Sequence, residues 1–215
     1  VLLVVVTADR GLCGAFNSNI IKAATKRIHE DFEEVHSTGK VDLLCIGKRG
    51  FQFFDKRDYN VIDSHIGLTG NPSFATVQAI VHELGEYFLS GEYDRVEIIY
   101  NEFKSAIQQK VIVEQLLPIK PTDISEDYYP VEYTFEPSED VLLAELLPRH
   151  INVQVYRVFL ESVASEHGAR MTAMEAASKN AAEMIDKLTL VYNRTRQAAI
   201  TTELIEVVSG KEAMK

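Results

Sequence analysis

The sequence is poor in basic residues and in cysteine and has no long hydrophobic run, and each shortage excludes a class of protein. Its 215 residues carry 22 Lys and Arg against 32 Asp and Glu, a net charge of −10. A nucleic-acid-binding protein and a polybasic membrane-surface protein both need a positive surface, so we expect neither, and no nucleic-acid partner. Cys13 and Cys45 are too few for a disulfide framework in a chain this long, and we expect two buried, reduced thiols. The longest early apolar run, residues 1–6, is far too short to span a membrane.

Apolar runs alternate with amphipathic segments over the first half of the chain. Short, β-branched runs predict buried strands. Between them, the apolar spacing and the capping residues predict helices, including one that Asn17 or Ser18 caps and one that the Asn-Pro-Ser at 71–73 opens. The predicted strands are 1–7, 41–47, 61–66, 96–103 and 111–117, and the predicted helices are 17–36, 48–57 and one after residue 73. Such alternation is typical of an α/β sandwich built from βαβ units.

The last two strands break the βαβ pattern. Only residues 104–110 separate them, whereas a parallel crossover needs about a dozen residues or more, so they should form an antiparallel hairpin. We therefore predict, for residues 1–120, an α/β fold with a mixed five-stranded, Rossmann-like sheet and flanking helices. A proline-rich connector, 121–137, follows, and its aromatic residues either pack on the domain or meet a partner.

A very long helix is predicted after the connector. Ser138 is a good cap for the start of the helix. No proline follows Pro148, and Gly168 is the only glycine between Pro148 and Gly210. Gly210 is a plausible end of the helix. The span 138–210 corresponds to roughly 105 Å of helix, and 211–215 is left as a tail.

This helix carries a coiled-coil pattern. In alternating steps of three and four residues, twelve of sixteen positions are apolar: Val153, Tyr156, Leu160, Val163, His167, Arg170, Met174, Ala177, Ala181, Met184, Leu188, Val191, Thr195, Ala198, Thr202 and Ile205. A 3.5-residue repeat predicts a seam buried against another helix rather than a helix curled over a sheet. The partner would come from a second copy, a different protein or residues before Val1. The alternative, a bundle that folds back on itself, would need a turn at Gly168.

Catalytic motifs are scarce. The six histidines show no paired metal-ligand spacing, and we expect no metal, no cofactor and no catalytic residue. Two glycine-containing loops, 9–17 and 47–50, follow strands and could either cradle a phosphate or serve as structural turns. The first reading leaves open a nucleotide- or phosphate-binding α/β enzyme with a helical oligomerisation tail.

Four segments resemble one family, the gamma subunit of F-type ATP synthases. The most specific is ITTELIEVVSG at 200–210, which is similar to the family's C-terminal signature, and TADRGLCGAFN at 7–17 resembles its first strand-to-helix loop. Segments 100–106 and 190–198 resemble it as well. The signature usually continues Gly-Ala, whereas Lys211 follows Gly210 here.

The resemblance implies a function and partners. The chain would be a non-catalytic rotor subunit of the central stalk, peripheral to a membrane on the cytoplasmic face of a bacterial inner membrane rather than the mitochondrial matrix face. Its α/β domain would rest on the c-subunit ring and bind the epsilon subunit (delta in mitochondria), and its helix would rise into the alpha and beta subunits. Family members begin with a long basic helix that pairs with the C-terminal one, so we expect this chain to lack its own N-terminal helix.

The resemblance also implies contact residues. Tyr133 and Glu136 match family positions at the c-subunit ring, although Tyr133 packing on its own domain is an equal alternative. Near the end of the helix, Arg196, Gln197, Thr201 and Glu203 match the stretch that meets the catalytic head. This stretch is also apolar on more than one side, as expected of a helix enclosed by other subunits.

Overall fold

The computed structural model describes residues 1–57, 59–70, 72–120 and 134–214. The chain forms two compact units, Val1–Thr172 and Ala173–Lys215. The first unit contains a sheet with helices on both faces, and the second unit is helical from Ala173 to Ala213.

The sheet of the first unit has five strands in the order β3-β2-β1-β4-β5. β1 pairs in parallel with both β2 and β4, β2 pairs in parallel with β3, and β4 pairs antiparallel with β5. The strands are β1 (Leu2–Val6), β2 (Asp42–Ile46), β3 (Asn60–His65), β4 (Val96–Phe103) and β5 (Gln109–Leu117). The predicted mixed sheet and its terminal hairpin are confirmed.

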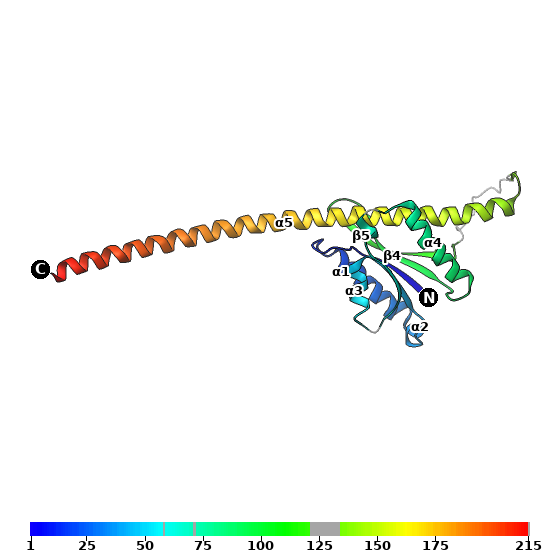
Figure 1. The fold of residues 1–215 in the computed structure, drawn as a ribbon, viewed down its shortest axis with the longest axis horizontal. Coiled ribbons are helices and arrows are strands. Elements are labelled where there is room, and N and C mark those ends of the chain that lie inside the picture. Colours follow the sequence, from blue (N-terminus) through cyan, green and yellow to red (C-terminus); the bar gives the residue numbers. More distant parts are fainter. Residues whose placement is uncertain (58, 71, 121–133, 215) are drawn as a thin grey trace, which may run out of the picture. The chain divides into compact units, whose positions relative to one another are not determined.

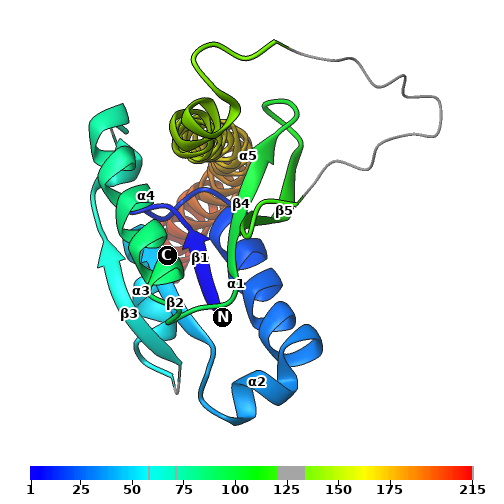
Figure 2. The same cartoon turned by 90° about the vertical axis from the view of Figure 1, so that its right-hand side faces the viewer.

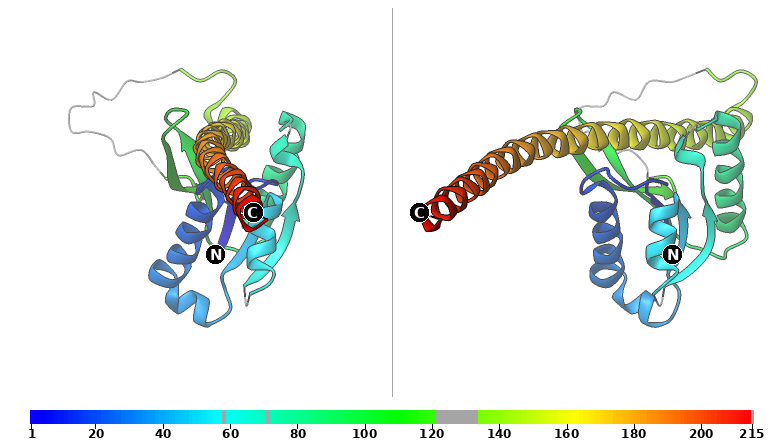
Figure 3. Two further views of the ribbon diagram at one scale, coloured as in Figure 1. Left: turned by 90° about the vertical axis from the view of Figure 1, so that its left-hand side faces the viewer. Right: turned by 60° about the vertical axis from the view of Figure 1, so that its left-hand side comes forward.

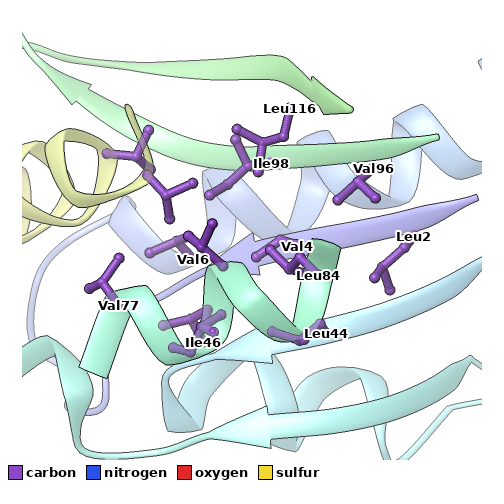
Figure 4. Packing of buried hydrophobic residues seen from close by; sticks show 14 of the residues in the cluster. Leu2, Val4, Val6, Leu44, Ile46, Val77, Leu84, Val96, Ile98 and Leu116 are labelled. Atoms are coloured by element: carbon purple, nitrogen blue, oxygen red, sulfur yellow. The ribbon is translucent and has the colours of Figure 1, made fainter. Parts of the chain in front are cut away.

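Alternate residues of β1 face two separate cores. The side chains of Leu2, Val4 and Val6 point to one face of the sheet (Figure 4). This face is covered by α4 (Phe74–Leu89) and by the first-unit part of α5 (Glu139–Ala213), as Figure 2 shows. Leu3 and Val5 point to the opposite face, which α1 (Phe16–Lys26) and α3 (Lys48–Phe54) cover (Figure 3). All five side chains are at most 1% exposed, and a strand buried on both faces explains the unbroken apolar run at the start of the sequence.

The prediction of one continuous helix over residues 17–36 is wrong. α1 passes into a π-helical turn, η1 (Arg27–Asp31), and Phe32 separates this turn from α2 (Glu33–Ser37). The wider turn places both Ile28 and Phe32 in the core, 0% and 6% exposed. Neither Asn17 nor Ser18 caps α1, because the N-cap is Ala15 and the Asn17 side chain accepts a hydrogen bond from the Ala8 amide instead.

The other helix starts agree better with the sequence. Ser73 caps α4 by accepting a hydrogen bond from the Thr76 amide, as the Asn-Pro-Ser pattern predicts. α3 begins where predicted but ends at Phe54 rather than near residue 57. A 3-10 turn, η2 (Leu68–Gly70), precedes α4.

The long helix is confirmed as one element of 75 residues, Glu139–Ala213 (Figure 1). It starts directly after Ser138, as predicted. It passes through Pro148 and Gly168 without a turn, which excludes the bundle folded back on itself. Gly210 does not end it, because α5 continues to Ala213.

Within the first unit α5 packs on the sheet, which the sequence argument excluded. Three α5 side chains, Val155, Val158 and Phe159, are at most 1% exposed. They belong to the core that the sheet forms with α4 and α5. The heptad positions Val153 and Leu160 are 55% and 46% exposed on the same helix. The helix therefore has two apolar faces here, one used by the sheet and one facing outward. Among the helices that the structure describes, none is long and apolar enough to cross a membrane.

Candidate functional site

The carboxyl end of β1 is the place where sheets of this kind usually bind phosphate groups. Here the Asp9 carboxylate lies three residues beyond the end of β1 and accepts hydrogen bonds from the segments that follow β2 and β3. It accepts hydrogen bonds from the Lys48 amide at 3.0 Å, from the Gly67 amide at 3.0 Å and from the Thr69 hydroxyl at 2.7 Å. A phosphate would need donors of this kind, and a side chain of the protein already pairs with them.

The glycines of the second loop serve close packing. A β-carbon at Gly47, where φ is +90°, would lie 2.0 Å from the Thr7 carbonyl oxygen. One at Gly50 would lie 2.8 Å from Thr7 Oγ1, which accepts a hydrogen bond from the Gly50 amide. Thr7, which directly follows β1, is fully buried. It therefore packs tightly against the start of α3. These contacts favour the structural-turn reading of the second loop, 47–50, over a nucleotide site.

The first loop and the β4–β5 hairpin contact residues 165–172 of α5. The Ser165 hydroxyl donates to the Asn101 carbonyl oxygen at 3.0 Å, and the Asn101 side-chain amide donates to the Phe16 carbonyl oxygen at 3.3 Å. Arg170 lies 2.7 Å from Glu166 and reaches the Gly11 carbonyl oxygen at 3.5 Å. The polar side chains of Asn101, Ser165 and Glu166 are buried, which the seam pattern alone did not reveal.

Gly168 explains how closely α5 approaches the hairpin. A β-carbon there would lie 3.0 Å from the carbonyl oxygen and 3.1 Å from the Cα of Ala106. Thr172 Oγ1 donates to the same carbonyl oxygen at 3.2 Å. The segment 100–106, one of the family-like motifs, is thus the part of the sheet on which α5 is seated.

The second unit exposes apolar side chains along its whole described length. The heptad residues Met184, Leu188 and Val191 are 61% to 63% exposed, and Ile205 is 61% exposed. Exposed apolar surface of this extent marks an interaction surface.

The four residues predicted to meet the catalytic head, Arg196, Gln197, Thr201 and Glu203, are all exposed on α5. Thr201 Oγ1 donates to the Gln197 carbonyl oxygen at 2.9 Å, so its proton stays within the helix and its oxygen can still accept. Arg196 and Glu203 are seven residues apart and share a face. Of the two residues predicted to contact the c-subunit ring, Glu136 is exposed, and Tyr133 lies outside the described residues.

Comparison with known proteins identifies the family. A family model described as ATP synthase matches residues 1–214. The chain is 53% identical over 214 residues to the ATP synthase gamma chain of Geobacter sp. (strain M21), covering 100% of this chain and 73% of that protein. The chain belongs to the ATP synthase gamma chain family. The gamma chain of Chlorobaculum parvum is 48% identical over 215 residues, which cover 100% of this chain and 74% of its own length.

Solved structures of ATP synthases contain chains with the same fold. The central stalk and c-ring structure of the Tetrahymena thermophila mitochondrial ATP synthase contains a chain with 29% identity and a TM-score of 0.64, aligned over 82% of this chain and 75% of that one. A chain of the Euglena gracilis mitochondrial enzyme aligns over 100% of this chain and 72% of its own, with a TM-score of 0.74 and 21% identity. The prediction of a non-catalytic central-stalk rotor subunit is confirmed.

Proposed function

We propose that α5 transmits torque as one member of a paired helical shaft. The observation that carries the proposal is the exposure of Met184, Leu188 and Val191 at a 3.5-residue spacing on a helix without a break. A single helix with this stripe is poorly stable in water, whereas two helices packed along it form a stiff rod. The pairing helix is the basic N-terminal helix typical of the family, and a helix from another chain is the alternative.

The first unit is then the foot of the shaft. Its seat under α5 is rigid, because buried hydrogen bonds from Ser165 and Asn101 and the Gly168–Ala106 approach fix the helix on the sheet. The Tetrahymena neighbour is described as a central stalk with a c-ring. By this likeness the foot would rest on a c-subunit ring, and by its resemblance to the family it would bind the epsilon subunit. Because the similar gamma chains of Geobacter and Chlorobaculum are bacterial, the complex would lie at the cytoplasmic face of a bacterial inner membrane. Glu136, with Tyr133, would contribute the ring contact.

The upper part of α5 would turn inside the alpha and beta subunits. The guanidinium of Arg196 is exposed and can make a forked, charge-assisted pair with an acidic loop. Gln197 follows it on the adjacent face, and the Thr201 oxygen and the Glu203 carboxylate lie further up. These four residues would therefore engage loops of the catalytic head during rotation.

The test uses assembled enzyme carrying Arg196→Ala together with Gln197→Ala. We expect lower ATP turnover and weaker proton coupling at normal assembly, because the polar contact to the head is lost. Lys179→Ala with Asn180→Ala is the matched control, since it removes an adjacent cation and amide from the exposed surface of the same helix. Wild-type turnover and coupling in the Arg196/Gln197 variant would refute the contact.

A further inference from the structure

Three potential metal ligands converge at the edge of the sheet, outside every surface described above. Asp63 and His65 lie on β3, and Glu83 lies on α4. One atom of each lies within 4.8 Å of the other two. His65 Nε2 is 3.4 Å from Asp63 Oδ2 and 3.9 Å from Glu83 Oε2.

A register shift in the sheet turns the two strand residues toward α4. Leu43 of β2 pairs with Val61, but Leu44 pairs with Asp63, so β3 holds one extra residue at this point. Leu44 and Ile46 face the core under α4, and their partners Asp63 and His65 now share that side. Without the irregularity, residues 63 and 65 would share the side of Val61, which packs against the opposite core. Bulges often re-aim side chains in this way next to functional sites.

Outer hydrogen bonds orient both carboxylates. Asp63 Oδ1 accepts from the Ser64 amide at 2.6 Å, and Glu83 Oε1 accepts from the Tyr87 hydroxyl at 3.1 Å. The second oxygen of each carboxylate is left to face His65. Such outer partners are typical of metal ligands.

The imidazole nitrogen between these oxygens is buried and makes no hydrogen bond to any described residue. A buried polar atom without a partner is costly, and a ligand that satisfies it is therefore expected. Two neighbouring carboxylate oxygens would repel one another, and a cation among the three atoms would neutralise them.

We propose that Asp63, His65 and Glu83 bind one Zn²⁺ ion and that the ion ties the edge strand β3 to α4. Separations of 3.4 and 3.9 Å between ligand atoms suit a four-coordinate ion with bonds of roughly 2.0–2.2 Å, and water completes the set. The imidazole selects zinc over Mg²⁺ and Ca²⁺, which prefer oxygen ligands only. The spacing of histidines in the sequence did not reveal this set, because Glu83 comes from another element.

The experiment titrates the full-length chain with Zn²⁺ against a chromophoric chelator, in the presence of excess Mg²⁺. We expect one zinc per chain, with binding weakened by His65→Ala, Asp63→Asn or Glu83→Gln more than the roughly 10–100-fold that is typical for the loss of an outer hydrogen-bond partner. Tyr87→Phe should weaken binding less, because it removes only the outer hydrogen bond. His82→Ala and Glu86→Gln are the matched controls, since this pair is exposed on the same helix at 3.7 Å and lacks a third ligand. They should leave the affinity unchanged.

A second measurement needs no variant. Co²⁺ in place of Zn²⁺ should give wild-type protein the intense visible absorption of a four-coordinate ion, displaced by one equivalent of Zn²⁺. Circular dichroism reports whether each variant is folded. The proposal is overturned if wild-type protein shows no saturable zinc binding, if Co²⁺ gives only the weak spectrum of a hydrated ion, or if folded Asp63→Asn and Glu83→Gln bind as tightly as the controls. In those cases the three side chains contact one another without holding a metal ion.

Discussion

Gly168 of α5 lies so close to Ala106 of the β4–β5 hairpin that a β-carbon would come within 3.0 Å of the Ala106 carbonyl oxygen. Alanine is a better helix former than glycine by about 1 kcal/mol, but overpacking costs about 1–3 kcal/mol. The hairpin cannot easily retreat, because Thr172 Oγ1 and Gln109 Nε2 both donate to that oxygen. We expect Gly168→Ala to lower the free energy of unfolding by about 1 kcal/mol in urea denaturation.

Gly210→Ala is the control for this prediction. No atom lies within 4 Å of its β-carbon position, so only the gain in helix propensity remains and stability should not fall. Equal effects of the two substitutions would show that the approach at Ala106 is not tight.

A second prediction concerns the ion pair between Arg27 and Glu97. The guanidinium donates to both carboxylate oxygens, at 2.9 and 2.7 Å, and Glu97 is only 3% exposed. Its hydrogen bonds to Glu97 raise the pKa of Arg27, despite partial burial. Among the described residues, Arg27→Ala would leave the buried Glu97 carboxylate with Arg95, at 3.6 Å, as its remaining ion-pair partner. We expect a loss of about 3 kcal/mol in the free energy of unfolding.

Arg157→Ala is the matched control, because Arg157 pairs with Glu114 at 3.3 Å while its own side chain is 49% exposed. Solvent screening limits such a pair to about 0–1 kcal/mol. A loss at Arg27 no larger than that at Arg157 would contradict the prediction.

The sequence predicted those parts of the fold that local rules decide. The seven residues that separate the predicted strands 96–103 and 111–117 are too few for a parallel crossover, and the observed connection between β4 and β5 is shorter still. The helix that the Asn-Pro-Ser pattern opens is also as expected, and Ser73 caps it. The break at Phe32 was missed, because a π turn depends on whether Ile28 and Phe32 can both enter the core. The sheet-facing side of α5 was missed as well, since Val155, Val158 and Phe159 lie between the heptad positions.

The predicted contact residues are a different case. Arg196, Gln197, Thr201, Glu203 and Glu136 are all exposed, so their roles depend on other chains and not on the fold of this one. These residues were predicted from the resemblance to the family. Contacts within the chain cannot identify them.

Glu136 gives a prediction for the foot. Glu136→Lys reverses an exposed charge three residues before the start of α5 at Glu139. If Glu136 faces the c-subunit ring, the reversal should weaken coupling between proton flow and ATP synthesis in assembled enzyme, while ATP hydrolysis by the detached head stays normal. Glu34→Lys, an equal charge change on the exposed surface of α2, should leave coupling intact. Unchanged coupling in Glu136→Lys would count against the ring contact.

Cys45 predicts a loss of stability at high pH. Burial, and to a smaller extent Asp55, raises the pKa of this thiol from 9.0 to about 12. The folded protein therefore keeps the proton at a pH where the unfolded chain releases it, so this stabilisation is full below pH 9.0 and is lost as the pH rises toward 12. The contribution of Cys45 to the slope is about 1.4 kcal/mol per pH unit. Cys45→Ala should flatten the alkaline slope, whereas Leu44→Ala should lower stability without changing the slope.

The last prediction separates the two sides of the upper helix. Leu188 belongs to the heptad stripe, and Leu190, about 200° further around the helix, does not. Both are exposed, at 61% and 71%, so aspartate at either position should cost the isolated chain only the similar, small loss of helix propensity. In the assembled complex Leu188→Asp would place a charge in the buried seam between two helices. We expect it to reduce the yield of assembled, ATP-hydrolysing enzyme strongly, and Leu190→Asp to reduce it much less. If both variants assemble equally well, the stripe from Met184 to Val191 is not the pairing face, and the shaft must be held together along another side of α5.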